Sequence, residues 1–169
     1  MKYRLTDEKK EWCGHILHRI EAVKDFADVK AGEKGGWIEQ EENLSQEDNC
    51  WVYDNARVCG DAQVCGDAWV YDNAQVFDNA QVCGNAWVCD DAEIKTPDDL
   101  IYIIGIGSCN RTTTVFRTKE NGLRVSCGCF CGDLNEFAAK VKETHGDSKY
   151  AWEYMSFIET VKIHFKVKE

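Results

Sequence analysis

The sequence predicts a mainly β fold, in which a parallel β-helix of about three eighteen-residue coils is flanked by an N-terminal cap and a small C-terminal α+β unit. The first observation is a repeat of seven consecutive hexads, from Val52 to Glu93, with valine first and alanine fifth. The second is that the hexad Trp-Val-Tyr-Asp-Asn-Ala at 51–56 returns at 69–74, after eighteen residues. The third is the loss of this period after Pro97. We therefore divide the chain into a cap (1–33), a hexapeptide-repeat β-helix (34–95) and an α+β unit (96–169).

The N-terminal segment is expected to cover the first coil. Its apolar residues alternate loosely through Gly-His-Ile-Leu-His-Arg-Ile-Glu-Ala-Val at 14–23, which fits a strand or a short helix. An open end of a β-helix exposes unpaired backbone groups, so a segment that covers it is required.

The period of six fits a short strand followed by a corner, and it fits neither an α-helix nor a long flat strand. Asp-Asn and Gly-Asp pairs supply the corners because these residues tolerate left-handed backbone angles. Three sides close a triangular coil, so residues eighteen apart stack at a spacing of roughly 4.8 Å. The expected columns are Trp51, Trp69 and Trp87, and beside them Tyr53, Tyr71 and Cys89.

The C-terminal unit is expected to contain strands followed by two helices. β-rich runs lie at 100–108, 112–118 and 123–130, and Lys-Glu-Asn-Gly at 119–122 is expected to turn the chain between the last two. The first helix is expected to begin at Asp133 and to end at Gly146. The predicted apolar faces are Leu134, Phe137, Ala138 and Val141 in the first helix, and Ala151, Tyr154, Ile158, Val161 and Phe165 in the second.

The hexads resemble those of hexapeptide-repeat proteins, in which an aliphatic residue, two turn residues and a small residue recur. The resemblance covers roughly residues 34–94 and implies a left-handed parallel β-helix. The flanking segments 18–51 and 125–155 resemble small uncharacterised hexapeptide-repeat proteins of phages and prophages of Gram-positive bacteria. This second resemblance implies a viral origin and gives no activity.

The charge is concentrated in the repeat. The formal net charge is −10, and residues 46–93 carry ten acids against Arg57 alone. Such a segment is not expected to bind nucleic-acid phosphates directly, and a basic protein partner suits it better. The chain shows neither a signal peptide nor a run of eighteen apolar residues, which predicts a cytoplasmic protein that does not bind membranes.

Many left-handed β-helix proteins are acyltransferases with a histidine on the β-helix as general base. The four histidines here are His15, His18, His145 and His164, so the β-helix itself carries none. Zinc carbonic anhydrases of this fold use three histidines on the coils, and these are also missing. We therefore expect a protein that is not an enzyme, although the acyltransferase stays as an alternative.

The cysteines are expected to act as reduced, apolar side chains. On one strand Cys127, Cys129 and Cys131 point to one face, so a metal site completed by His145 is conceivable, but a plain apolar face fits their spacing better. Stacked Cys65 and Cys83 are within bonding range, yet a cytoplasm favours free thiols. We predict no metal and no cofactor.

The corner aspartates have a structural and a functional interpretation. Corners require Asp and Asn, and the nine-residue repeat of calcium-binding β-rolls does not occur. However, acidic columns without Lys or Arg repel themselves, so this charge is a candidate for partner binding. The predicted acidic surface comprises Asp48, Asp54, Asp61, Asp67, Asp72, Asp78, Asp90 and Asp91.

The aromatic column is expected to be an exposed apolar strip that something must cover. The candidates are the C-terminal unit, a second copy of the chain or a foreign target, and self-association through a flat side of the β-helix is preferred. Tryptophan and tyrosine are also common anchors of binding sites. The predicted interaction face is Trp51, Tyr53, Trp69, Tyr71 and Trp87.

The first functional hypothesis is a self-associating phage-type protein that inhibits a bacterial defence or nucleic-acid-handling system. Its acidic surface would occupy the basic nucleic-acid-binding surface of a host protein, as an anti-CRISPR does. The second is a sponge for nucleotide second messengers, held at a subunit interface or between the β-helix and the C-terminal unit, with tryptophans stacking on bases and Arg111, Arg117 and Arg124 contacting phosphates. An acyltransferase and a structural virion protein are the remaining alternatives.

Overall fold

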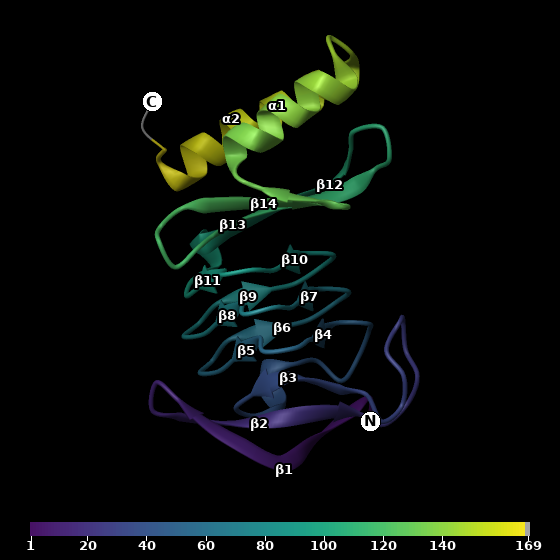
Figure 1. The fold of residues 1–169 in the computed structure, drawn as a ribbon, viewed down its shortest axis with the longest axis vertical. Coiled ribbons are helices and arrows are strands. Elements are labelled where there is room, and N and C mark those ends of the chain that lie inside the picture. The colour runs from purple at the N-terminus through teal and green to yellow at the C-terminus, as the bar shows by residue number, and fades with distance from the viewer. Residues whose placement is uncertain (168–169) are drawn as a thin grey trace.

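The computed structural model describes residues 1–167, and its elements stack in layers along one long axis (Figure 1). An N-terminal hairpin forms one end, a three-turn β-solenoid forms the middle, and a sheet covered by two helices forms the other end. The predicted mainly β fold, with its repeat and its C-terminal strands and helices, is therefore confirmed.

The N-terminal cap is an antiparallel hairpin of β1 (Tyr3–Trp12) and β2 (His15–Ala22), so of the two expected forms the strand is correct. Strand β2 pairs with β3 (Lys34–Ile38), which in turn starts a parallel side of the solenoid. The hydroxyl of Tyr3 donates to the backbone oxygen of Leu44 at 2.6 Å, and Lys2 Nζ donates to that of Cys50 at 2.8 Å. These bonds satisfy carbonyl groups at the end of the solenoid that would otherwise lack partners.

The solenoid has three sides of short parallel strands, and partners lie eighteen residues apart, as in Trp51 opposite Trp69. The valine of each hexad and the alanine of each hexad are buried, because they fill the narrow interior of the coil. One side contains β3, β5 (Arg57–Val58), β8 (Gln75–Val76) and β11 (Glu93–Ile94); the second contains β4 (Trp51–Val52), β7 (Trp69–Val70) and β10 (Trp87–Val88); the third contains β6 (Gln63–Val64) and β9 (Gln81–Val82).

The corners have the left-handed backbone that the turn residues predict. Asp54, Asp72 and Asp90 have φ angles of 49°, 59° and 54°, and Gly66 and Gly84 have 66° and 65°. Two short 3₁₀ helices, η1 (Glu41–Asn43) and η2 (Pro97–Asp99), mark the entry to and the exit from the regular coils.

Two expectations about cysteines are wrong. Cys65 and Cys83 form a disulfide, because coil stacking places their Cα atoms 4.7 Å apart, within the range that a disulfide spans. The segment 127–131 is not one strand but a hairpin, in which Cys127 pairs with Phe130 across a two-residue turn. Gly128, with φ +60°, permits this tight turn.

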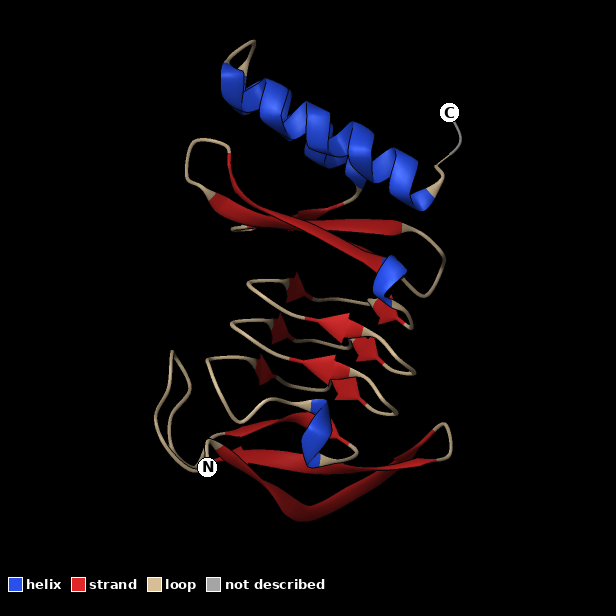
Figure 2. Cartoon of the chain, turned by 180° about the vertical axis from the view of Figure 1, so that it is seen from behind, coloured by secondary structure: helices blue, strands red, loops and turns tan. Residues whose placement is uncertain are grey.

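The C-terminal unit is an antiparallel sheet with helices on its outer face (Figure 2). The strands are β12 (Leu100–Ile106), β13 (Arg111–Arg117), β14 (Leu123–Cys127) and β15 (Phe130–Gly132), and the helices are α1 (Leu134–His145) and α2 (Lys149–Phe165). Successive side chains of β13 point to opposite faces of the sheet. Phe116 packs into the solenoid core on one face, and Val115 packs against the helices on the other. The helix boundaries at Asp133 and Gly146 agree with the prediction.

Neither of the two described helices combines the length and the apolar character needed to cross a lipid bilayer.

The first prediction concerns the stacked glycines of the corners. A Cβ atom on Gly66 would lie 3.0 Å from the backbone N and O of Gly84, and its φ is +66°. We expect Gly66→Ala to lower the free energy of unfolding by about 2–3 kcal/mol, measured by denaturant titration, because left-handed strain and a backbone clash add.

Gly14→Ala is the matched control, since Gly14 has φ +85° but nothing within 4 Å of an added Cβ. It should cost about 1–2 kcal/mol from strain alone. Equal losses in the two variants would contradict close stacking at the Gly66 corner.

Candidate functional site

The predicted aromatic column is divided by the fold. Trp51 is fully buried, with ring centroids 6.0 Å from Tyr3 and 5.3 Å from Phe26. The expectation that Trp51 belongs to an exposed strip is therefore wrong, because the N-terminal cap and the following loop cover it. Trp69 and Trp87 are only half-buried, and their rings stack with centroids 5.4 Å apart and planes 4° apart.

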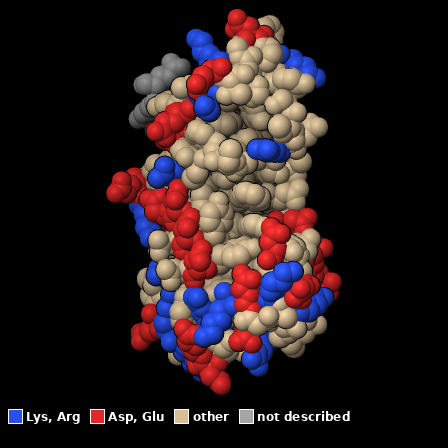
Figure 3. Space-filling view, turned by 45° about the vertical axis from the view of Figure 1, so that its right-hand side comes forward, with Lys and Arg blue, Asp and Glu red and all other residues tan. Residues whose placement is uncertain are grey.

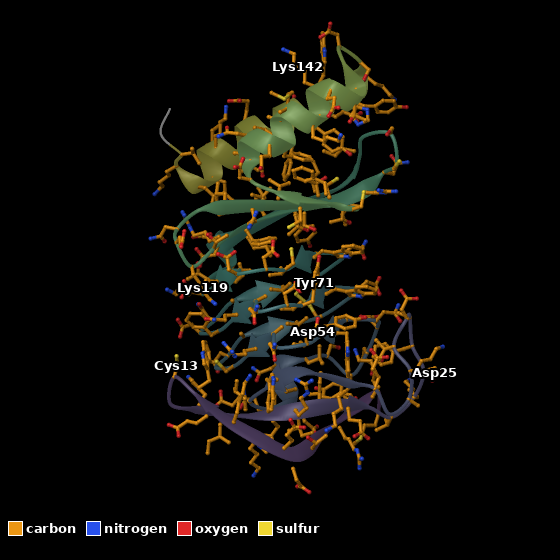
Figure 4. The ribbon with its side chains drawn as sticks, in the orientation of Figure 1. Cys13, Asp25, Asp54, Tyr71, Lys119 and Lys142 are labelled. Atoms are coloured by element: carbon orange, nitrogen blue, oxygen red, sulfur yellow. A yellow bond between two sulfur atoms is a disulfide. The ribbon has the colours of Figure 1, made fainter. Side chains whose placement is uncertain are left out.

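The two tyrosines of the predicted face are half-buried beside this column. Tyr53 packs between Trp51 and Trp69, with centroid distances of 6.5 Å and 5.4 Å. Tyr71 packs against the solenoid core one coil above Asp54, in the middle of the molecule in Figure 4. Tyr53 therefore supports the tryptophans and Tyr71 packs on the core, so that neither ring is a freely exposed surface.

A groove of about 820 Å³ opens beside the half-buried tryptophans, where the solenoid meets the C-terminal sheet. Trp69 and Trp87 form its apolar side. The polar groups come from the preceding corner and from the C-terminal sheet, and the loop after β2 contributes Ala27. They and their neighbours are Ala27, Asn49, Asp67, Asn85, Arg111, Thr112, Ser126, Gly128 and Cys129. On this face of the molecule, uncharged side chains surround a hollow that has acidic groups along its margins (Figure 3).

The groove has one basic residue, Arg111, among the residues that line it. Arg111 lies at the start of β13, and its guanidinium passes over the backbone of Gly128, where any Cβ would collide with it. The glycine that permits the β14–β15 turn therefore also makes room for this cation. On the solenoid side, Asn49 Nδ2 donates to Asp67 Oδ1 at 2.9 Å, which orients both side chains of the corner.

The three arginines predicted to contact phosphate do not come together. Arg111 lines the groove, while Arg117 Nε lies 3.2 Å from Asp99 Oδ1 and its guanidinium lies over the Phe165 ring. Arg124 Nε lies 3.6 Å from Asp90 Oδ2, at another corner of the solenoid. Of the three, the structure places Arg111 alone beside the tryptophans.

The predicted acidic surface is spread over all three corners of the solenoid. The C-terminal unit brings Arg124 and Lys119 to the upper end of one corner, where they share a shallow depression with Asp90 and Asp91. Lys119 lies in the turn between β13 and β14, and Figure 4 shows it at the left side of the molecule. Asp54, Asp72, Asp90 and Asp91 occupy this corner, Asp48 and Asp67 the corner before the tryptophans, and Asp61 and Asp78 the third.

A second cluster, which the sequence did not reveal, joins the cap to the solenoid. His15 Nδ1 lies 2.9 Å from Glu39 Oε2, and the Cys59 thiol lies within the same group. A thiol, an imidazole and a carboxylate are the groups of a nucleophile, its base and the residue that orients the base. However, burial raises the pKa of the Cys59 thiol to about 12. A catalytic thiol needs a lowered pKa, so this arrangement favours a structural role.

The three cysteines and the histidine considered above as a metal site do not come together in the fold. Cys127 Sγ lies 3.9 Å from the Tyr154 hydroxyl, and Cys129 lies in the groove. His145, at the end of α1, stacks on Tyr154 of α2. Cys131 instead lies beside Cys89 of the third coil, with the sulfur atoms 3.2 Å apart.

Comparison with known families supports the repeat. The family described as YdcK Beta solenoid repeat matches residues 52–66 and residues 62–78, within the regular hexads. The chain is thus similar to a β-solenoid repeat over part of its length. None of the curated proteins matches the chain.

The second prediction tests the Cys59 cluster. A folded-state pKa near 12, above the usual value near 9, keeps Cys59 protonated up to high pH, so stability gained from this thiol is present below pH 9 and is lost as pH rises toward 12. We expect iodoacetamide at pH 8 to alkylate the exposed Cys13 rapidly and to leave Cys59 unmodified, as measured by peptide mass spectrometry. Alkylation of Cys59 at the rate of Cys13 would instead indicate an activated thiol.

Proposed function

We propose that this chain is a non-enzymatic binding module that holds a planar, anionic small molecule of the nucleotide class in the groove beside Trp69 and Trp87. The observation that supports it is the combination of two stacked half-buried indoles with one guanidinium in the lining of the same groove. Indoles stack on nucleobases, and a guanidinium can donate two parallel hydrogen bonds to the oxygens of one phosphate.

The size and the polar groups of the groove suit such a ligand. A volume of about 820 Å³ falls within the range typical of small-molecule sites. Asn85, Ser126 and Thr112 offer donors and acceptors to base edges and hydroxyl groups, and Asp67 offers an acceptor to an amino group. The lining residues thus supply stacking, hydrogen bonding and one positive charge in a single site.

The same residues favour binding over catalysis. Among the described residues that line the groove, none is a histidine, and Asp67 is the only carboxylate. Deprotonating an acceptor in acyl transfer needs a general base placed at the reacting group. The resemblance of the flanking segments to phage proteins adds a biological setting, in which the protein would sequester a nucleotide signal of bacterial defence.

The third prediction tests ligand binding by thermal shift and then by calorimetry. The panel is cyclic mono- and dinucleotides, with adenosine as the uncharged comparison and acetyl-CoA as the probe for the acyltransferase alternative. We expect a cyclic nucleotide to raise the Tm. Arg111→Gln should weaken its affinity about ten- to a hundredfold, because a charged hydrogen bond is lost, and Trp87→Leu about tenfold.

Arg117→Gln is the matched control, since Arg117 pairs with Asp99 outside the groove. The affinity of this variant for the cyclic nucleotide should stay within about twofold of the wild-type value. Light scattering on wild type and Trp87→Leu checks whether a second copy of the chain covers the groove. A panel without any stabilising nucleotide, or equal losses with Arg117→Gln, would contradict the proposal.

A second candidate function is occupation of a basic host surface by the acidic solenoid. It is favoured by the exposed side chains of Asp48, Asp54, Asp61, Asp67 and Asp78, which extend over all three corners. Evenly spaced carboxylates accelerate association with a positively charged channel. An inhibitor of a nucleic-acid-handling enzyme is the activity that this charge pattern suits.

The fourth prediction compares one corner of the solenoid with the other two. If Asp54 and Asp72 contact such a partner, the double change to Asn should weaken inhibition of a guide-RNA-directed nuclease about tenfold and reduce its dependence on salt. DNA cleavage at increasing inhibitor concentration measures this.

The control double change is Asp48→Asn with Asp78→Asn, at the other two corners. These residues have φ angles of 51° and 55°, close to the 49° and 59° of Asp54 and Asp72, so both doubles remove equal charge from equivalent turns. Equal inhibition by the two variants, or no inhibition by the wild type, would argue against this candidate.

A further inference from the structure

A pair of thiols joins the third coil of the solenoid to the C-terminal sheet. Cys89 directly follows β10 and is almost fully buried, while Cys131 lies in β15 and is exposed. Their sulfur atoms lie 3.2 Å apart, and Cys131 Sγ lies 3.1 Å from Asp90 Oδ2. Two thiols and a carboxylate therefore converge from segments that are 42 residues apart in the chain.

The three ligand atoms lie close enough together to share one metal ion. All of them lie within 4.8 Å of one another. With Zn–S bonds of about 2.3 Å, two thiolates on one zinc ion are about 3.8 Å apart. The observed separation of 3.2 Å would have to widen by roughly 0.6 Å to hold zinc, but to shorten by about 1.1 Å to become a disulfide.

The charges at this site also favour a cation. Asp90 Oδ2 contacts the Cys131 thiol, and Asp72, one coil below, accepts the backbone amide of Asp90 with its Oδ2 at 3.3 Å, so a second carboxylate lies near the site. Arg124, 3.6 Å from Asp90 Oδ2, offsets part of this charge. Thiolates beside carboxylates repel one another, and a divalent ion that binds them directly removes that repulsion.

We propose that Cys89, Asp90 and Cys131 bind a zinc ion. Two thiolates and one carboxylate are ligands that zinc accepts, and the softness of the thiolates disfavours magnesium and calcium. The exposure of Cys131 leaves the fourth position to water. The ion fastens β15 to the third coil, close to the β14–β15 turn that carries Gly128 and Cys129 into the groove.

Zinc binding is independent of the nucleotide proposal, and the experiment uses the metal alone. The full-length protein, kept reduced and stripped of metal, is titrated with ZnCl₂ by calorimetry, and Co²⁺ substitution is followed by absorption. We expect one equivalent of zinc, a raised Tm and cobalt spectra with thiolate charge transfer and tetrahedral d–d bands. Cys131→Ser should weaken zinc affinity by more than about a hundredfold.

Two controls make the assignment specific. Cys129→Ser removes an exposed thiol two residues away and should keep the wild-type zinc affinity. The double change Cys65→Ser with Cys83→Ser should keep it too, and it removes the two cysteines of the solenoid disulfide, which become thiols in the reduced protein. Because Cys131 is exposed, its serine variant should fold, and an unchanged circular dichroism spectrum verifies this. Zinc binding that survives in Cys131→Ser, or a Cys89–Cys131 disulfide that persists in the presence of reductant and prevents metal binding, would overturn the proposal.

Discussion

The parallel hydrogen bonding between successive coils is the constraint on which the rest of this structure depends. Each coil must repeat the path of the one below it at a spacing of roughly 4.8 Å, so that bonds such as that from the Tyr53 amide to the Val70 carbonyl, 2.8 Å long, continue through the stack. Each residue of a coil therefore lies directly above the residue eighteen positions earlier in the chain. The stacked indoles of Trp69 and Trp87 and the disulfide between Cys65 and Cys83 are consequences of this one repeat.

A repeat of this kind cannot end without a cap, and both candidate sites lie where the upper cap meets the last coil. The Tyr102 ring lies over Gly84, where the next coil would otherwise stack. The Trp87 amide donates to Thr114 Oγ1 of β13 at 3.2 Å, in place of a carbonyl from a following coil. These contacts bring Arg111 to the tryptophans and Cys131 to Cys89, so the chemistry of the molecule arises from the junction and not from the repeat itself.

The features that the sequence predicts well are those fixed by a local period. The interior valines, the left-handed corners at Asp54, Asp72 and Asp90, and the helix that begins after Asp133 all follow from spacing and turn chemistry. The features that it does not predict depend on contacts between segments that share no period. Nothing in the hexads indicates that Tyr3 and Phe26 cover Trp51, and nothing in Cys-Gly-Cys-Phe-Cys indicates that the chain turns at Gly128 and sends Cys131 to Cys89. The glycine was the available signal for that turn.

The distribution of charge connects the two proposed activities. The repeat is strongly acidic, whereas the C-terminal unit supplies bases at the junction: Arg124 faces Asp90, Lys119 lies near Asp91, and Arg111 enters the groove. An anionic ligand would be repelled from the free solenoid but attracted to this junction, because Arg111 is its nearest positive charge among the lining residues. A basic partner would be drawn in the opposite direction, toward the lower coils around Asp54. The same charge separation would therefore direct small anions to the groove and cationic surfaces to the solenoid, so that the two proposed sites have opposite charge preferences.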